Sequence, residues 1–262
     1  MLFNSVVLCL AALAAGAVNA VAGGGTLLTF PTLYVVLGTT AEAARLANCT
    51  STVALVPGAL ASAWGYRSEL GAARRWLIWL TPPSLLGGLA GSALLTELSP
   101  DTFKVLVPWL ILTAALLFAL QPQVSRWTGI GQSHALPSRK TMVAIAAFQF
   151  LVSVYGGYFG AGIGILMLSA LAMMGLSDIH VMNALKTVLN MFINGVSVVW
   201  FIWRGDVEWR YASMMAVAAI IGGYCGARIA RRLDRNLVRK GVVAIGFTLA
   251  ACEFYRQVFR GE

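Results

Sequence analysis

The stretch that decides the fold is Trp76–Leu95, with the sequence WLIWLTPPSLLGGLAGSALL, an apolar run that contains no charged residue. A helix needs about 20 mostly apolar residues to span the hydrocarbon core of a bilayer. Comparable runs recur at residues 105–120, 142–158, 184–203 and 211–229. They are continuous, whereas the strands of an outer-membrane barrel alternate between apolar and polar residues. The sequence therefore predicts a bundle of membrane-spanning helices.

The composition of the whole chain agrees with this prediction. Hydrophobic residues make up 59% of the 262 residues and charged residues only 11%, whereas soluble domains carry about 25% charged residues. The net charge of +9 comes from basic residues in short loops, which is the positive-inside pattern of membrane insertion. We therefore expect a lipid bilayer, and not nucleic acid, as the partner of these charges.

The residue types that carry enzymatic chemistry are sparse. Four cysteines and two histidines are scattered without the spacing of a redox or metal site. We expect no catalytic residue, no metal and no cofactor, and an intramembrane enzyme or cofactor-binding subunit is the weaker alternative. No Lys or Arg precedes Arg45, so we expect the first apolar segment to be a membrane helix and not a cleaved signal peptide.

An internal repeat divides the chain. The motif Gly87-Gly88-x-x-Gly91 of the opening stretch recurs as Gly222-Gly223-x-x-Gly226, and both motifs are typical of close helix packing. A shift of 137 positions aligns Gly23 with Gly160, Gly25 with Gly162, Gly38 with Gly175, Ala47 with Ala184, Thr50 with Thr187, Gly58 with Gly195, Arg67 with Arg204 and Glu69 with Asp206. The sequence thus predicts a first membrane repeat at residues 1–120, a cytoplasmic linker at 121–140 and a second membrane repeat at 141–262.

Each repeat contains about five hydrophobic segments, of which the second is too short to span a bilayer. The expected segments are 4–22, 26–37, 46–64, 76–95 and 104–120, then 141–158, 163–174, 183–203, 211–229 and 240–257. Residues 26–37 would rise only about 18 Å as a helix, against a hydrocarbon core of about 30 Å. Glycines precede both short segments, at Gly23-Gly24-Gly25 and at Gly160-Ala161-Gly162-Ile163-Gly164. We expect an all-α polytopic membrane protein of eight to ten segments, with these two as glycine-broken or re-entrant short helices.

Charges in equivalent loops predict opposite orientations for the two repeats. Loops 65–75 and 228–240 and the linker are rich in Lys and Arg, so we expect them in the cytoplasm. Their counterparts, loops 204–210 and 96–104, lack this bias and are expected outside together with both termini. Equivalent loops on opposite faces mean that the repeats are inverted. Inverted repeats with broken helices are typical of secondary transporters.

Polar residues gather in the third segment of each repeat. They are Asn48, Thr50, Ser51 and Thr52 in the first repeat, with Arg45 three residues before them, and Lys186, Thr187, Asn190 and Asn194 in the second. The spacing of four places Lys186, Asn190 and Asn194 on one helical face. Polar residues are costly inside a membrane and usually face a cavity or the bundle interior. The alternatives are that the amides and hydroxyls only hold helices together and that Lys186 extends to the membrane interface.

These polar residues and the glycine breaks together suit an oxyanion. Amides, hydroxyls and a cation can hold its oxygens, and the N-terminus of a helix adds backbone N–H groups and a positive dipole end. We predict that Lys186 supplies the fixed positive charge and that Arg45 is the nearest second cation.

The motifs resemble a known family. The stretches Gly23–Pro31 and Ala47–Gly58 resemble the first repeat of the TauE/SafE family of sulfite-exporter-like permeases, and Phe159–Gly164 with Lys186, Thr187 and Asn194 resembles the second. The resemblance implies a multi-pass plasma-membrane transporter of sulfite or related sulfur-containing and organic anions. The implied substrate-binding residues are Gly23, Gly24, Gly25, Asn48, Thr50, Ser51, Thr52, Gly160, Gly162, Gly164, Lys186, Thr187, Asn190 and Asn194, to which we add Arg45.

The sequence as a whole predicts a secondary transporter for small inorganic or organic anions, without cofactors, that works by alternating access. A passive anion channel is the alternative with the same lining. The sequence leaves open whether the chain forms a homo-oligomer.

Overall fold

The computed structural model describes residues 2–21, 24–65, 70–127, 139–173, 179–229 and 235–259. These residues form ten α-helices and no strand. The helices are α1 (Leu2–Val21), α2 (Thr26–Leu37), α3 (Ala41–Gly65), α4 (Leu70–Glu97), α5 (Pro100–Trp127), α6 (Arg139–Tyr158), α7 (Ile163–Met173), α8 (Ile179–Arg204), α9 (Trp209–Ile229) and α10 (Arg235–Phe259). Gly23, the segments 66–69 and 128–138 and the centre of the loop 228–240 lie outside the described residues.

The prediction of an all-α polytopic membrane protein is confirmed. Within the described residues, Arg74–Glu97, Pro100–Leu117, Thr141–Tyr158 and Val181–Arg204 are long and apolar enough to cross a membrane. Large apolar side chains point outward on several helices, such as Leu151 with 64% and Val217 with 60% of its surface exposed. Apolar surface on this scale would be unfavourable in water, but it is the surface that lipid tails require.

The ten expected segments correspond in order to the ten helices, and most helices extend beyond the apolar run that predicted them. Helix α5 continues to Trp127, where the sequence placed the start of the linker at residue 121, and α4 begins at Leu70 instead of 76. Hydropathy falls where the chain leaves the hydrocarbon, whereas the backbone hydrogen bonds of a helix continue through the interface. The two short segments are short helices in the structure, α2 and α7.

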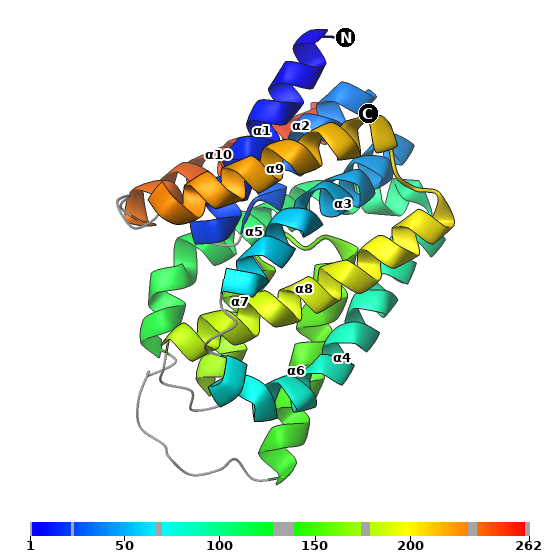
Figure 1. Cartoon of the computed structure of the whole chain (residues 1–262). Coiled ribbons are helices and arrows are strands. Elements are labelled where there is room, and N and C mark those ends of the chain that lie inside the picture. The colour runs from blue at the N-terminus through cyan, green and yellow to red at the C-terminus, as the bar shows by residue number, and fades with distance from the viewer. Residues whose placement is uncertain are drawn as a thin grey trace.

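Helix packing has an internal symmetry (Figure 1). Helix α1 packs on α9 as α6 packs on α4, α3 packs on α9 as α8 packs on α4, and α2 packs on α3 as α7 packs on α8. Exchanging α1–α5 for α6–α10 converts each of these contacts into its partner. Helices α3 and α8 contact each other, and so do α5 and α10. This is the packing that two structurally equivalent halves produce.

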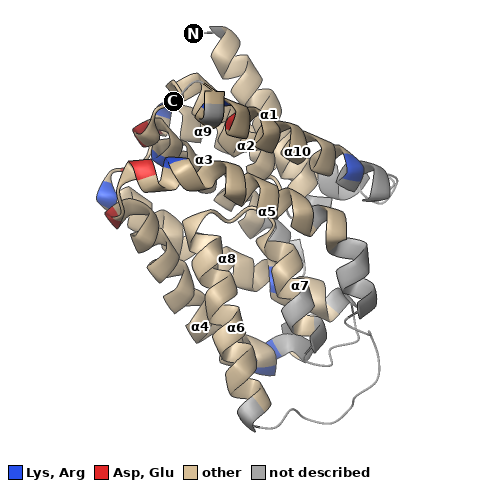
Figure 2. Cartoon of the chain, turned by 180° about the vertical axis from the view of Figure 1, so that it is seen from behind, with Lys and Arg blue, Asp and Glu red and all other residues tan. Residues whose placement is uncertain are grey.

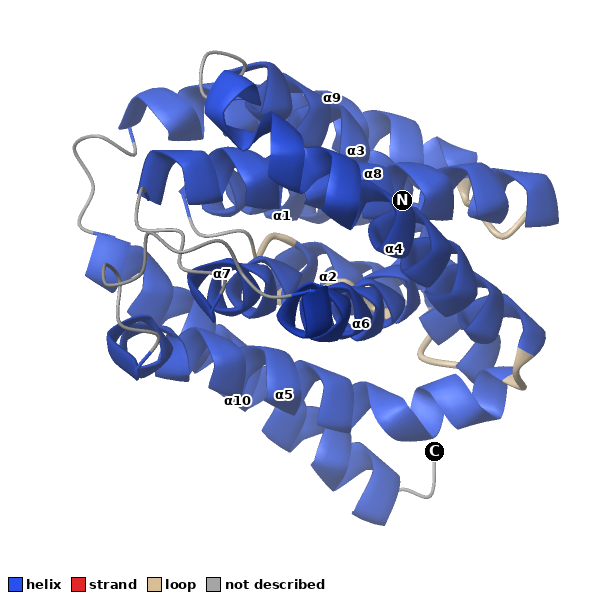
Figure 3. Cartoon of the chain, turned by 90° about the horizontal axis from the view of Figure 1, so that it is seen from below, coloured by secondary structure: helices blue, strands red, loops and turns tan. Residues whose placement is uncertain are grey.

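Glycines permit the closest of these helix contacts. A Cβ atom at Gly87 or Gly91 of α4 would collide with backbone of α6, and one at Gly222 of α9 would collide with backbone of α1. The prediction that these small-residue motifs serve packing is therefore confirmed for these three glycines. The half-length helices α2 and α7 lie inside, with α5 and α10 on one side and α3, α8 and α9 on the other (Figure 3).

The ends of the molecule differ in charge. Arg204 pairs with Glu97 at 3.2 Å and joins the C-terminal ends of α8 and α4. Because the 28 residues of α4 rise about 42 Å, residues 70–75 lie at the opposite end from 204–210, as inverted repeats require. The acidic residues that the structure describes gather at the Glu97 end (Figure 2), which we call the acidic end. They are Glu42, Glu97, Asp101, Asp206, Glu208 and Glu253.

Candidate functional site

The first glycine break is fixed by a hydrogen bond to an amide side chain. Gly24 and Gly25 are buried between α1 and α2, and the backbone N–H of Gly25 donates to Oδ1 of Asn19 at 2.8 Å. A Cβ atom at Gly25 would meet the carbonyl of Ala15 at 2.6 Å, so only glycine fits this approach. Asn19 therefore caps the turn from which α2 begins.

The second break uses backbone conformations that other residues rarely adopt. Gly160 and Gly162 have φ angles of +77° and +76°, in the left-handed region where a side chain is strained. The phenol of Tyr155 donates to the carbonyl of Ala161 at 2.7 Å and fixes the loop between α6 and α7. The second half-helix thus starts at a defined point inside the protein.

A small polar cavity lies where the two breaks meet. Its volume is about 30 Å³, and it is lined by Asn19, Thr26, Thr52, Leu55, Val56, Ala59, Gly160, Ile163, Asn190 and Asn194. A water molecule needs about 10–15 Å³ by this measure, so the cavity has room for about two. An oxyanion such as sulfite is larger, so its binding would require the lining to separate.

Both repeats contribute to this cavity in equivalent ways. Thr26 is the first residue of α2 and Ile163 the first residue of α7, and the shift of 137 positions that relates the repeats takes one onto the other. The first N–H groups of a helix have no partner within the helix and carry the positive end of its dipole. Two half-helix N-termini on one cavity make a site suited to negative charge.

The amides of α8 form the opposite wall. Asn194 donates from Nδ2 to the carbonyl of Asn190 and to its Oδ1, both at 3.0 Å. Thr52 of α3 also lines the cavity and donates to the carbonyl of Asn48 at 2.9 Å. The lining side chains are amides, hydroxyls and apolar groups, and none of them is charged.

The structure brings together only part of the predicted site. Thr52, Gly160, Asn190 and Asn194 line the cavity, and the glycines 24, 25, 162 and 164 belong to the breaks beside it. The remaining described candidates lie off the lining; they are Arg45, Asn48, Thr50, Ser51, Lys186 and Thr187.

Three polar residues of α3 instead hold neighbouring segments. Ser51 shares a hydrogen bond of 2.5 Å with Thr29 of α2, and Thr50 accepts from the backbone N–H of Glu208 at 3.0 Å. Asn48 donates from Nδ2 to the carbonyl of Tyr158 at 2.9 Å. The contacts of Ser51 and Asn48 are the interhelical bonding that the sequence left as an alternative, whereas Thr50 holds the loop before α9.

Lys186 lies one helical turn from the cavity lining. Its Nζ is 3.2 Å from Oδ1 of Asn183, and its aliphatic chain packs over Gly164 in the first turn of α7. The side chain of Lys186 therefore lies beside the start of α7 and is not part of the cavity lining.

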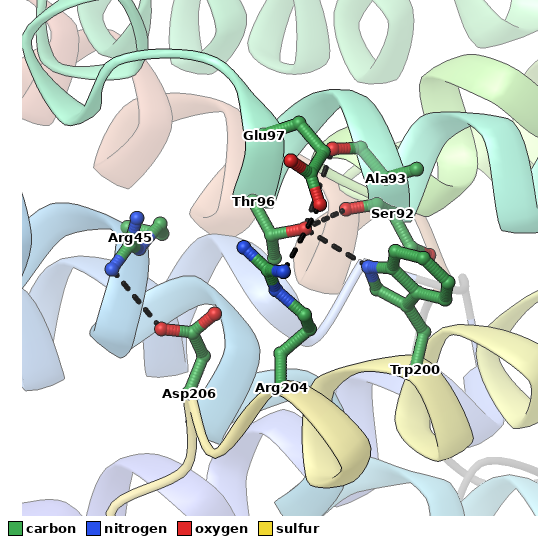
Figure 4. A network of polar contacts seen from close by, with 8 residues as sticks. All are labelled: Arg45, Ser92, Ala93, Thr96, Glu97, Trp200, Arg204 and Asp206. Carbon is green, nitrogen blue, oxygen red and sulfur yellow. Dashed lines mark hydrogen bonds and ion pairs between the residues drawn. The ribbon is translucent and has the colours of Figure 1, made fainter.

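The charge of Arg45 is already matched. Its guanidinium pairs with Asp206 at 3.1 Å, and the two side chains are only 22% and 16% exposed. Figure 4 shows this ion pair beside the Arg204–Glu97 pair and the hydrogen bond of 2.9 Å from Trp200 to Thr96. These contacts tie α3 and α4 of the first repeat to α8 and the loop after it.

Six residues of the cavity lining were missed by sequence reasoning, and two of them, Asn19 and Thr26, are polar. Asn19 and Thr26 flank the first glycine break on either side. The signal was present, because Asn19 is an amide within an apolar segment and precedes the glycines by less than two turns. Among the described residues, no group of three His, Cys, Asp or Glu side chains is placed to hold a metal.

Comparisons with known proteins agree with this architecture. The Sulfite exporter TauE/SafE family matches residues 8–252. A "Probable membrane transporter protein" of Haemophilus influenzae is 28% identical, over 92% of this chain and 90% of its own length. The Escherichia coli K12 "Probable membrane transporter protein YfcA" is 26% identical over 95% and 89%. The Sinorhizobium "Probable membrane transporter protein ORF9" is 27% identical over 93% and 89%. No solved structure matches.

The helical fold, the paired half-helices and these relatives define the class of protein: the chain is a multi-pass membrane transporter. It belongs to the TauE/SafE family.

Proposed function

We propose that this transporter carries small oxyanions, sulfite or related sulfur-containing and organosulfonate anions, across the plasma membrane by alternating access. The observation that carries the proposal is the cavity shared by the N-termini of α2 and α7. Thr26 and Ile163, the first residues of these two helices, both border the cavity, so the positive dipole ends of α2 and α7 lie at the same site. A cation would meet repulsion there, whereas an anion is stabilised.

The amides support the choice of an oxyanion. Asn19, Asn190 and Asn194 border the cavity, and an amide NH₂ group can donate two hydrogen bonds. The NH₂ group of Asn194 donates to Asn190 in this conformation and would have to turn toward a bound anion. An oxyanion with several acceptor oxygens can use donors from opposite walls at once. The relatives are named only as membrane transporters, so the substrate class rests on this donor set and on the family's name.

The repeats supply the motion. We propose that the halves at residues 1–120 and 141–262 rock against each other around the cavity, with the residues 121–140 as a cytoplasmic linker. The small cavity fits a closed conformation between the two open ones, because it has room for about two waters and is too small for an oxyanion.

A thermal-shift screen of the purified protein tests the substrate class. The probes are sulfite, sulfate, thiosulfate, sulfoacetate and simple carboxylates. An anion that binds only the folded state raises the midpoint of thermal unfolding by mass action, by about 2.7 kcal/mol of stability at 100 times its Kd. Absence of a shift with every sulfur anion would sink this substrate class.

Counterflow in proteoliposomes then separates a carrier from a channel. Excess unlabelled anion inside the vesicles should accelerate uptake of labelled anion if one site alternates between the two faces. A passive channel with the same lining would show no such trans-acceleration.

A further inference from the structure

We propose that Arg45 is an entry site for the anion on the route to the cavity, and that Asp206 occupies this site as a built-in counter-ion that closes the acidic end. This inference rests on the proposed function. In it, the incoming anion replaces the Asp206 carboxylate as the partner of Arg45, and the closed end opens as the ion pair separates.

The first support is the position of Arg45 on α3. Residues 45, 48, 52 and 56 follow one another at helical spacing, so they share one face of the helix. Thr52 and Val56 line the cavity, and Arg45 lies at the acidic end of the same stripe. This stripe of α3 therefore runs from the partly exposed guanidinium of Arg45 to the cavity.

The second support is the buried side chain of Asn48, which lies between Arg45 and the cavity on this stripe. Asn48 is 1% exposed. Within the part of the chain that the structure describes, its Oδ1 has no hydrogen-bond partner, and neither has the buried hydroxyl of Tyr158. Tyr158 is the residue whose carbonyl Asn48 contacts. Buried polar atoms without partners are costly. In a passage that excludes water when closed and fills with water when open, both atoms would be hydrated in the open state. Such a passage accounts for the presence of both atoms here.

The third support is the loop that carries Asp206. Gly205 has a φ angle of +77° and turns the chain out of α8 over the outer end of α3. Asp206 binds Arg45, Val207 is buried in the core, and the N–H of Glu208 donates to Thr50. A loop of the second repeat thus covers a helix of the first, and any rocking of the repeats that opens this end must release it.

The test uses Cys49 as a native reporter, since it is buried one turn from Arg45 on α3. Cys9, Cys225 and Cys252 are replaced by alanine, and intact cells are treated with a small membrane-impermeant thiosulfonate. Asp206→Asn keeps the shape of the side chain but removes its charge. We expect the rate of Cys49 with this reagent, divided by its rate with a small membrane-permeant thiosulfonate, to rise roughly tenfold or more in this variant, because a hydrogen bond between charged groups is lost. The ratio removes the direct effect of the Asp206 charge on the reactivity of the thiol.

The matched control is Glu97→Gln, which removes the neighbouring Arg204–Glu97 ion pair at the same end. This variant makes the same change of charge but leaves the Arg45–Asp206 ion pair intact, so Cys49 should react as slowly as in the parent protein. The double variant Arg45→Asp with Asp206→Arg restores an ion pair of reversed polarity and should return the slow rate. Equal Cys49 rates in the parent, Asp206→Asn and Glu97→Gln proteins would overturn the gate.

Sulfite titration by thermal shift tests the entry site separately. Asp206→Asn frees Arg45 and should lower the apparent Kd for sulfite about tenfold, whereas the charge-reversed pair should bind more weakly than the parent. Unchanged sulfite affinity in Asp206→Asn contradicts the entry site even if Cys49 becomes reactive. A parent protein that binds no anion at all refutes the proposed function, while the Cys49 rates still decide whether the ion pair closes this end.

Discussion

At the scale of single residues, the position of Lys186 determines how strongly its charge should affect anion affinity. It lies beside Asn183 and over the first turn of α7, one turn from the cavity wall at Asn190. Lys186→Gln should weaken anion affinity about tenfold, because a charge one turn away acts through space and is partly screened. Lys186→Arg should keep most of the affinity, since the charge stays. Isothermal titration with sulfite measures the affinity of both folded variants. Wild-type affinity in Lys186→Gln would refute the prediction that Lys186 supplies the positive charge for the anion.

Asn194 offers a sharper test of the cavity. Asn194→Asp is isosteric but places a negative charge against the proposed anion, so sulfite binding should fall at least a hundredfold while the protein still folds. Gln257→Glu makes the same charge change on α10, where the side chain contacts the carbonyl of Lys104, and should bind normally. Equal binding by the two variants would remove the cavity from the substrate path.

The sequence predicted polar residues of the cavity more successfully than it predicted contacts between distant residues. Asn190, Asn194 and Thr52 were predicted to face a cavity, because polar side chains in a membrane helix have few other favourable positions. The ion pair of Arg45 was not predicted, since Asp206 is far along the chain and belongs to the other repeat. Hydropathy and spacing describe each helix alone, whereas such a contact depends on how two helices from different repeats pack.

At the scale of helices, close packing of α4 on α6 depends on glycine. Gly91→Ala would place a methyl group against the backbone of Val154 and Tyr158 and should cost about 1–3 kcal/mol of stability. The matched control is Gly195→Ala on α8, where an added Cβ meets no described atom within 4 Å. Its stability should be unchanged or slightly raised by the better helix propensity of alanine. Thermal unfolding in detergent compares them, and equal midpoints would contradict the packing role.

The two short helices were predicted from length and glycine alone, and the sequence placed both starts correctly. It did not indicate which glycine carries the unusual backbone. Gly162 has a φ angle of +76°, so any side chain there strains the turn as well as the site. Loss of folded protein in a Gly162 variant is therefore expected and says little about transport.

At the scale of the whole molecule, inverted repeats predict which segments share a face of the membrane. Ser99 is exposed at the acidic end, and Gly71 is exposed near the start of α4 at the opposite end. In a cysteine-free background, Ser99→Cys should react with an impermeant thiol reagent from outside, and Gly71→Cys only after the cells are opened. Reaction of both from the same side would falsify the inverted arrangement.

The uncharged lining of the cavity has a consequence for the energetics of transport. A bound anion with no opposite charge beside it in the cavity carries its own charge through the membrane field. Each elementary charge that crosses 100 mV changes free energy by about 2.3 kcal/mol, which is close to fiftyfold in concentration. In a cell with a negative interior this work favours outward movement of anions. If no cation travels with it, the anion would thus move outward, and Arg45 would be its exit site in that direction.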